Sequence, residues 1–110
     1  MSITPNALIQ PKFASITLTA DYTSPSRVII DKFTATNVSG GAVSLTVNIV
    51  PPSGSPISGN RIISNRLIAP NETYVSNELA GHVLEANNAI WNVATASNAL
   101  VLFASGRTIS

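Results

Sequence analysis

The chain has 110 residues, a length that fits one domain with a single core. It has no cysteine, which excludes disulfide bonds and thiolate metal sites. Charged residues make up 10% of the chain, the net charge is +1, and the six Lys and Arg are scattered, so we expect no nucleic-acid partner.

Other features of the composition concern where the protein is made and where it acts. Ser, Thr and Asn supply about a third of the residues, and a surface so poor in charge suits a protein that spends its life docked in an assembly. No apolar run reaches the roughly 18 residues that cross a bilayer, so we expect no membrane partner. Residues 1–5 lack the basic and apolar regions of a signal peptide, which predicts synthesis in the cytoplasm without export by the usual route.

The first twelve residues differ in pattern from the remainder of the sequence. They contain Ile3, Leu8 and Ile9 without a clean alternation of apolar and polar residues. An exposed apolar segment is a liability unless it covers something. We interpret residues 1–12 as an extended arm that lies on a neighbouring molecule or folds back on the domain. In the first case, deleting residues 2–11 would leave the domain folded.

The rest of the chain is dominated by a two-residue alternation broken by Gly, Pro, Asn and Ser clusters, which is typical of strands. The clearest example is residues 43–49, where Val, Leu, Val and Ile alternate with Ser, Thr and Asn. We expect about seven to eight antiparallel strands, seven of them at residues 13–20, 27–38, 43–49, 61–68, 72–79, 89–96 and 99–105. The predicted fold is all-β: one β-sandwich domain over residues 13–106, followed by a tail at 107–110.

The breaks between these strands have different roles. Ser39, Gly40 and Gly41 predict a hairpin loop, and Pro70-Asn71 predicts a tight turn. The longest break is residues 51–60, which begin with Pro51-Pro52 and contain Ile57. Long loops in compact domains are often functional, so this loop is a candidate contact.

Residues that could carry chemistry are few. His82 is the one histidine, and no nucleophile motif accompanies it, so we expect no enzyme activity and no small-molecule substrate. Glu78, His82 and Glu85 would share one face of a helix, but Gly81 and the extended pattern around them argue against a metal site. We expect no cofactor. Tyr22, Tyr74 and Trp91 could stack on a sugar, although such residues more often pack in a core or at its rim.

The order of several short motifs resembles a family of small phage virion proteins. The chain reads Thr36-Asn37, then Ser39-Gly40-Gly41, then residues 47–54 ending in Pro-Pro-Ser-Gly, then Asn60-Arg61-Ile62-Ile63, residues 69–73, Val83-Leu84-Glu85-Ala86 and residues 100–104. The likeness covers about three-quarters of the chain. It implies a jelly-roll-like or immunoglobulin-like β-sandwich without catalysis. The length is similar to that of capsid decoration, or cement, proteins of short-tailed phages, which bridge neighbouring capsomers, often as dimers.

This resemblance implies a virion protein, and we expect it on the capsid exterior. The expected partners are the major capsid protein and a second copy of the chain, with a dimer favoured. Such a protein can contact its neighbours through an apolar arm, a protruding loop or an open sheet edge. The candidate interface residues are Ile3, Leu8, Ile9, Pro51, Pro52, Ile57, Arg107 and Ile109. The alternative that the sequence leaves open is a tail or tail-fibre module that binds host glycan or receptor.

Overall fold

The computed structural model describes residues 3–109 and has nine strands. They are β1 (Ile3–Phe13), β2 (Thr19–Thr23), β3 (Arg27–Asn37), β4 (Val43–Val50), β5 (Arg61–Ile68), β6 (Thr73–Val75), β7 (Val83–Leu84), β8 (Ala89–Ala94) and β9 (Leu100–Ile109). A 3-10 turn, η1 (Ser58–Asn60), precedes β5. Over residues 3–109 there is no α-helix, and thus no helix of the length and apolarity that crossing a membrane requires.

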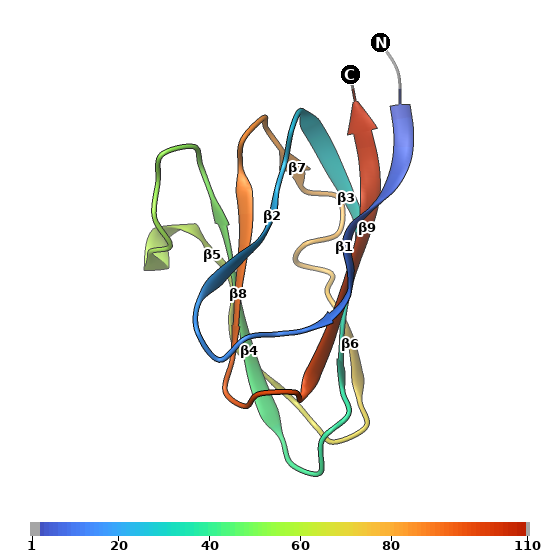
Figure 1. The fold of residues 1–110 in the computed structure, drawn as a ribbon, viewed down its shortest axis with the longest axis vertical. Helices are drawn as coiled ribbons and strands as arrows, with labels where there is room; N and C mark the ends of the chain where they lie inside the picture. The colour runs from blue at the N-terminus through green and yellow to red at the C-terminus, as the bar shows by residue number, and fades with distance from the viewer. Residues whose placement is uncertain (1–2, 110) are drawn as a thin grey trace.

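The strands form two antiparallel sheets that pack face to face (Figure 1). Sheet A has the order β1-β9-β3-β6, with β7 also paired to β3, and sheet B has the order β2-β8-β4-β5. The predicted β-sandwich is confirmed. The pairs β1·β9, β2·β8, β3·β6 and β4·β5 are nested, as if one long hairpin were rolled up, and this nesting is the jelly-roll topology.

The core lies between the sheets and follows the alternation in the sequence. In β4, Val43, Leu45 and Val47 are buried on the inner face. In β9, Leu100, Leu102 and Ala104 are buried, while the residues between them face outward. A half-buried strand of a sandwich has this pattern because successive side chains point to opposite faces.

Both ends of the described chain belong to sheet A. Residues 3–13 form edge strand β1, which pairs with β9 from Ile3↔Ile109 to Phe13↔Val101 (Figure 1). The segment predicted as an arm is therefore extended, but residues 3–12 are paired within the domain. Residues 107–109, predicted as a tail, likewise continue β9; residues 1, 2 and 110 lie outside the described part of the chain. The strand predicted at 13–20 is divided by the crossing from sheet A to sheet B at residues 14–18.

One end of the sandwich is held by the side chain of Asn37, which is buried. Its Nδ2 donates to the carbonyls of Gly41 and Ile68 at 2.8 and 2.9 Å, and its Oδ1 accepts from the backbone N–H and hydroxyl of Ser39. The backbone N–H of Asn71 donates to the Asn37 carbonyl at 2.8 Å. One asparagine thus joins the 38–42 loop, the end of β5 and the 69–72 turn.

Candidate interaction surface

The outer face of sheet A carries a group of seven neighbouring side chains without a charge. Strand register places Val75 beside Thr34 and Thr34 beside Phe103, and it places Thr73, Thr36, Val101 and Phe13 in the adjoining row. We call this group the uncharged face: Phe13, Thr34, Thr36, Thr73, Val75, Val101 and Phe103. Phe13 and Val75 are each 46% exposed and Phe103 is 38% exposed.

The polar atoms of the uncharged face are largely satisfied within it. The hydroxyls of Thr36 and Thr73 lie 3.0 Å apart and bond to each other. Burying such a surface against a partner therefore leaves few hydrogen-bonding groups without a partner. The apolar area removed from water contributes about 25 cal/mol per Å² to the free energy of binding. Contiguous exposed apolar side chains of this kind are typical of interaction sites.

Charged groups on the outer face of sheet A begin with Lys32, which pairs with Ser105 in the row next to Thr34 and Phe103, and continue toward the other end of the sheet. Arg107 forms an ion pair with Asp31, with Nη2 2.9 Å from Oδ1, and both side chains are about two-fifths exposed. Such exposed pairs contribute little to stability because water screens them. Arg107 is half-buried on the outer face and engaged with Asp31, rather than part of a separate tail.

The sheet edges offer few places for an added strand. β1 contains Pro5 and Pro11, which have no N–H to donate to a ladder. β5 has a register shift and contains Asn65 in the left-handed region at φ 49°, while β6 has only three residues. These are the ways by which natural sheets limit edge-to-edge pairing. β2, the other edge strand of sheet B, has only five residues and a register shift, so the faces and loops are the larger surfaces for contact.

The 51–60 loop is held against sheet B. Asn48 of β4 donates from Nδ2 to the Ile57 carbonyl and to Asn60 Oδ1, at 2.9 and 2.7 Å. Asn60 in turn donates to the Ser55 carbonyl and accepts from the Ile57 N–H. The loop therefore presents Pro51, Pro52 and Ile57 to solvent in a fixed arrangement, with Ile57 61% exposed.

The residues predicted as an interface divide into three groups. Ile3, Arg107 and Ile109 lie on the outer face of sheet A, where Ile3 pairs with Ile109. Pro51, Pro52 and Ile57 lie on the loop beside sheet B, on the opposite side of the sandwich (Figure 1). Leu8 and Ile9 are 7% and 2% exposed and pack in the domain's own core. Their prediction as interface residues is wrong because β1 turns them inward.

Sequence reasoning missed Phe13, Val75 and Phe103. The run at residues 100–104 is apolar at every position, so either set of alternate residues could have faced the core. A strand in a two-layer sandwich has only one buried face, and this alone implies that part of such a run is exposed.

A second cluster closes the open side of the sandwich between β5 and β6. The Arg66 guanidinium lies 4.5 Å from the centroid of the Tyr74 ring, and the Tyr74 hydroxyl donates to Glu78 Oε1. The hydrogen bond from Tyr74 lowers the pKa of Glu78. Burial, and then the bond to Glu78, raises the pKa of Tyr74. Both shifts favour the pair as observed, a neutral phenol beside an ionised carboxylate.

The side chains of Glu78, His82 and Glu85 do not form a metal-binding cluster. Glu78 is bonded to Tyr74, and Glu85 forms an exposed ion pair with Arg27 at 3.0 Å. Within residues 3–109, no cluster of metal-ligating side chains and no pocket occurs. Of the aromatic residues considered for sugar stacking, Tyr74 is buried, and Tyr22 and Trp91 are half-buried.

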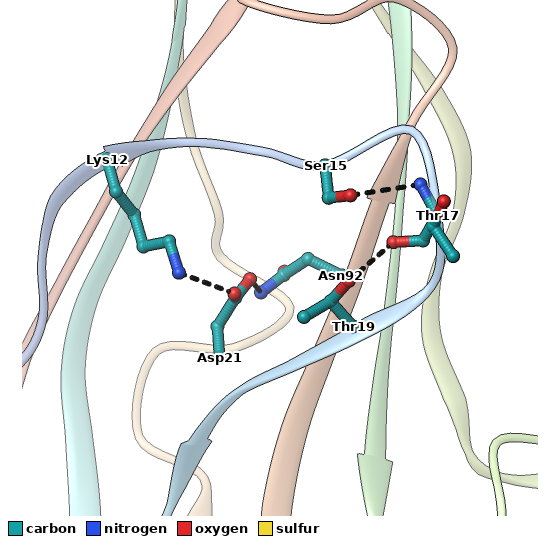
Figure 2. Close-up of polar contacts among 6 residues, drawn as sticks. All are labelled: Lys12, Ser15, Thr17, Thr19, Asp21 and Asn92. Carbon is teal, nitrogen blue, oxygen red and sulfur yellow. Dashed lines mark hydrogen bonds and ion pairs between the residues drawn. The ribbon is translucent and has the colours of Figure 1, made fainter.

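A buried polar group lies on the other open side of the sandwich, between β1 and β2. Lys12 Nζ is 2.9 Å from Asp21 Oδ1, and Asn92 Nδ2 donates to Asp21 Oδ2 (Figure 2). The loop that crosses between the sheets lies beside it, where the Thr17 N–H donates to Ser15 Oγ and Thr19 Oγ1 donates to the Thr17 carbonyl. The Asp21 side chain is 3% exposed, so this charge is buried and paired.

Comparison with known proteins gives no match: no family model, no curated protein and no solved structure matches this chain.

Proposed function

We propose that this chain is a structural protein of a phage particle that decorates the outer shell and bridges neighbouring capsid subunits. The uncharged face of sheet A is the observation that carries the proposal. It offers exposed aromatic and aliphatic side chains beside threonines whose hydroxyls are partnered. A face of this kind suits docking on another protein better than free exposure to water.

Bridging is supported by the presence of two separate surfaces. The uncharged face belongs to sheet A, and the exposed residues Pro51, Pro52 and Ile57 project beside sheet B. A molecule with contact surfaces on both sides can touch two subunits at once. Weak contacts of this type gain strength when they act together, because the second contact forms within an existing complex.

The resemblance of the motif order to small phage virion proteins adds to this support and supplies the class of partner. Some of these motifs have a structural role here: Asn37 holds one end of the sandwich, and Asn60 holds the 51–60 loop. The proposed partner is the major capsid protein.

A matched pair of substitutions tests the docking face. Phe103→Lys places a charge in the uncharged face, where docking would desolvate it, and we expect at least a tenfold loss of affinity for particles that lack the protein. Leu67→Lys is the control because Leu67 is also exposed, at 61%, but lies on β5 of sheet B. Occupancy is measured by sedimentation of particles with added protein.

Unchanged occupancy of the Phe103→Lys variant, with the fold verified by circular dichroism, would overturn docking through this face. Saturable binding of the native chain to host polysaccharide, with no binding to particles, would favour the tail-module alternative instead.

A further inference from the structure

Three side chains from two sheets converge on one carboxylate. Lys12 comes from β1 of sheet A, while Asp21 and Asn92 come from β2 and β8 of sheet B. Lys12 Nζ is 2.9 Å from Asp21 Oδ1, and Asn92 Nδ2 donates to Asp21 Oδ2. In Figure 2 the amine and the amide flank the carboxylate.

Backbone irregularities produce this convergence. Asp21 falls at the register shift between Ala20 and Tyr22, so it is the extra residue of a bulge in β2. Lys12 pairs with the inward-facing Leu102 of β9, which directs its side chain toward the space between the sheets. Bulges re-aim side chains, and here one of them brings a carboxylate to the amide of a neighbouring strand.

The amide of Asn92 is buried, with the Asp21 carboxylate on one side and apolar neighbours along and across the sheet. It is fully buried, flanked along β8 by the buried residues Ile90 and Ala94 and paired with Val47 of β4. Its Oδ1 accepts no hydrogen bond, although its Nδ2 is bonded to Asp21. A buried carbonyl without a donor is costly, and an apolar residue at this position would avoid that cost. An apolar residue would, however, leave Asp21 Oδ2 without this donor, so what the hydrogen bonds leave unexplained is the unbonded Oδ1.

We propose that Lys12 and Asn92 become joined by an intramolecular isopeptide bond, with Asp21 as the proton carrier. Asp21 Oδ1 takes a proton from the Lys12 ammonium, which leaves a neutral amine with a lone pair. The amine nitrogen attacks Asn92 Cγ and forms a new C–N bond. A proton passes through Asp21 to Nδ2, the Cγ–Nδ2 bond breaks, and ammonia leaves and becomes ammonium with the remaining proton.

The reaction needs no other reactant. One ammonium side chain and one primary amide give one secondary amide and one ammonium ion, so atoms and charge balance. Asp21 touches both reacting groups and is regenerated as a carboxylate. The flexible four-carbon stem of Lys12 and its partly exposed amine, 48% for the side chain, allow the nitrogen to move from Oδ1 toward the amide carbon.

The product would link β1 of sheet A to β8 of sheet B through a covalent bond. It would close the side of the sandwich opposite the Arg66–Tyr74–Glu78 cluster, so that edge strand β1 could not separate from sheet B. This inference stands apart from the proposed function, because the bond forms within one molecule.

The intact mass of the purified, folded chain tests the proposal directly. We expect a mass lower than that of the sequence by one ammonia, about 17 Da, after allowance for removal of Met1. Trypsin should leave the chain uncut after Lys12 and give a branched peptide in which residues 1–27 are joined to residues 67–107. Tandem mass spectrometry of that peptide distinguishes a cross-link from ammonia loss at another asparagine.

Variants provide matched controls, since the chain has only two lysines. Lys12→Arg keeps the charge and the ion pair but should restore the full mass, and Lys32→Arg should retain the loss. Asp21→Asn should also restore the full mass, because an amide cannot carry the proton. A native chain of full sequence mass would overturn the proposal, as would loss of ammonia in the Lys12→Arg variant.

Discussion

At the scale of single residues, Gly106 is the glycine with the least room for a side chain. It lies in β9 between Asn6 of β1 and Ile30 of β3. A Cβ at this position would lie 2.2 Å from the Ile29 carbonyl oxygen and 3.0 Å from Leu8 Cδ1. The nearest atom belongs to backbone, so a larger residue cannot be accommodated by rotating a side chain.

We predict that Gly106→Ala lowers the free energy of unfolding by about 3 kcal/mol, the upper part of the usual range for overpacking. Chemical denaturation monitored by circular dichroism measures this. Gly40→Ala is the control, because a Cβ there meets nothing within 4 Å. Equal stability of the two variants would contradict the close approach of β9 to β3.

Asn37, from the short motif Thr36-Asn37, has a structural role in the fold. The side chain bonds to the 38–42 loop and to Ile68, and its backbone carbonyl accepts from Asn71. A buried amide that satisfies groups of two segments cannot be replaced by another residue type without leaving hydrogen bonds unmade. Ile68, however, lies 31 residues away in the sequence, and this partner could not be named from the sequence alone.

At the scale of the elements, prediction succeeded where one face of a strand is apolar and the other polar. Residues 43–49 form β4, as expected, and the breakers around residues 40 and 70 lie between strands. Prediction was poorer for β1, because Leu8 and Ile9 are adjacent inward residues at a bulge, which destroys the two-residue period. The same lack of contrast in residues 100–104 hid the outward position of Phe103.

Because β1 contributes to the core, its removal should not leave an intact domain. Deletion of residues 2–11 removes Leu8 and Ile9 and exposes the edge of β9. We expect a loss of about 4 kcal/mol from the apolar side chains alone, a large part of the 5–15 kcal/mol typical of a domain. Thermal unfolding of the truncated chain measures this loss. A truncated chain that melts with the native midpoint would contradict the pairing of β1 with β9.

At the scale of the whole molecule, the nested order of strands puts the two candidate surfaces on different sheets. Sequence analysis predicted a sandwich and left its topology open between jelly-roll and immunoglobulin-like. Register decides it, since β1 pairs with β9 and β2 with β8. Pairings between residues almost a full chain length apart have no local signal in a sequence.

The proposed Lys12–Asn92 bond would affect the stability of the whole molecule. By the relation for loops closed by a disulfide, a covalent link that encloses most of the chain stabilises the fold by about 4 kcal/mol through the unfolded state. Such a gain is large beside the roughly 5–15 kcal/mol that is typical of a whole domain. It would add to the ion pair and hydrogen bonds that already hold β1 to sheet B.

The proposal that this protein lies on a phage shell is tested most directly by a cryo-electron reconstruction of a purified particle of the phage proposed to carry it. We predict density for the 11.5 kDa sandwich on the outer shell, with the outer face of sheet A against one capsid subunit and the 51–60 loop reaching a neighbour. A shell without this density, or density for the chain only at the tail, would contradict the account.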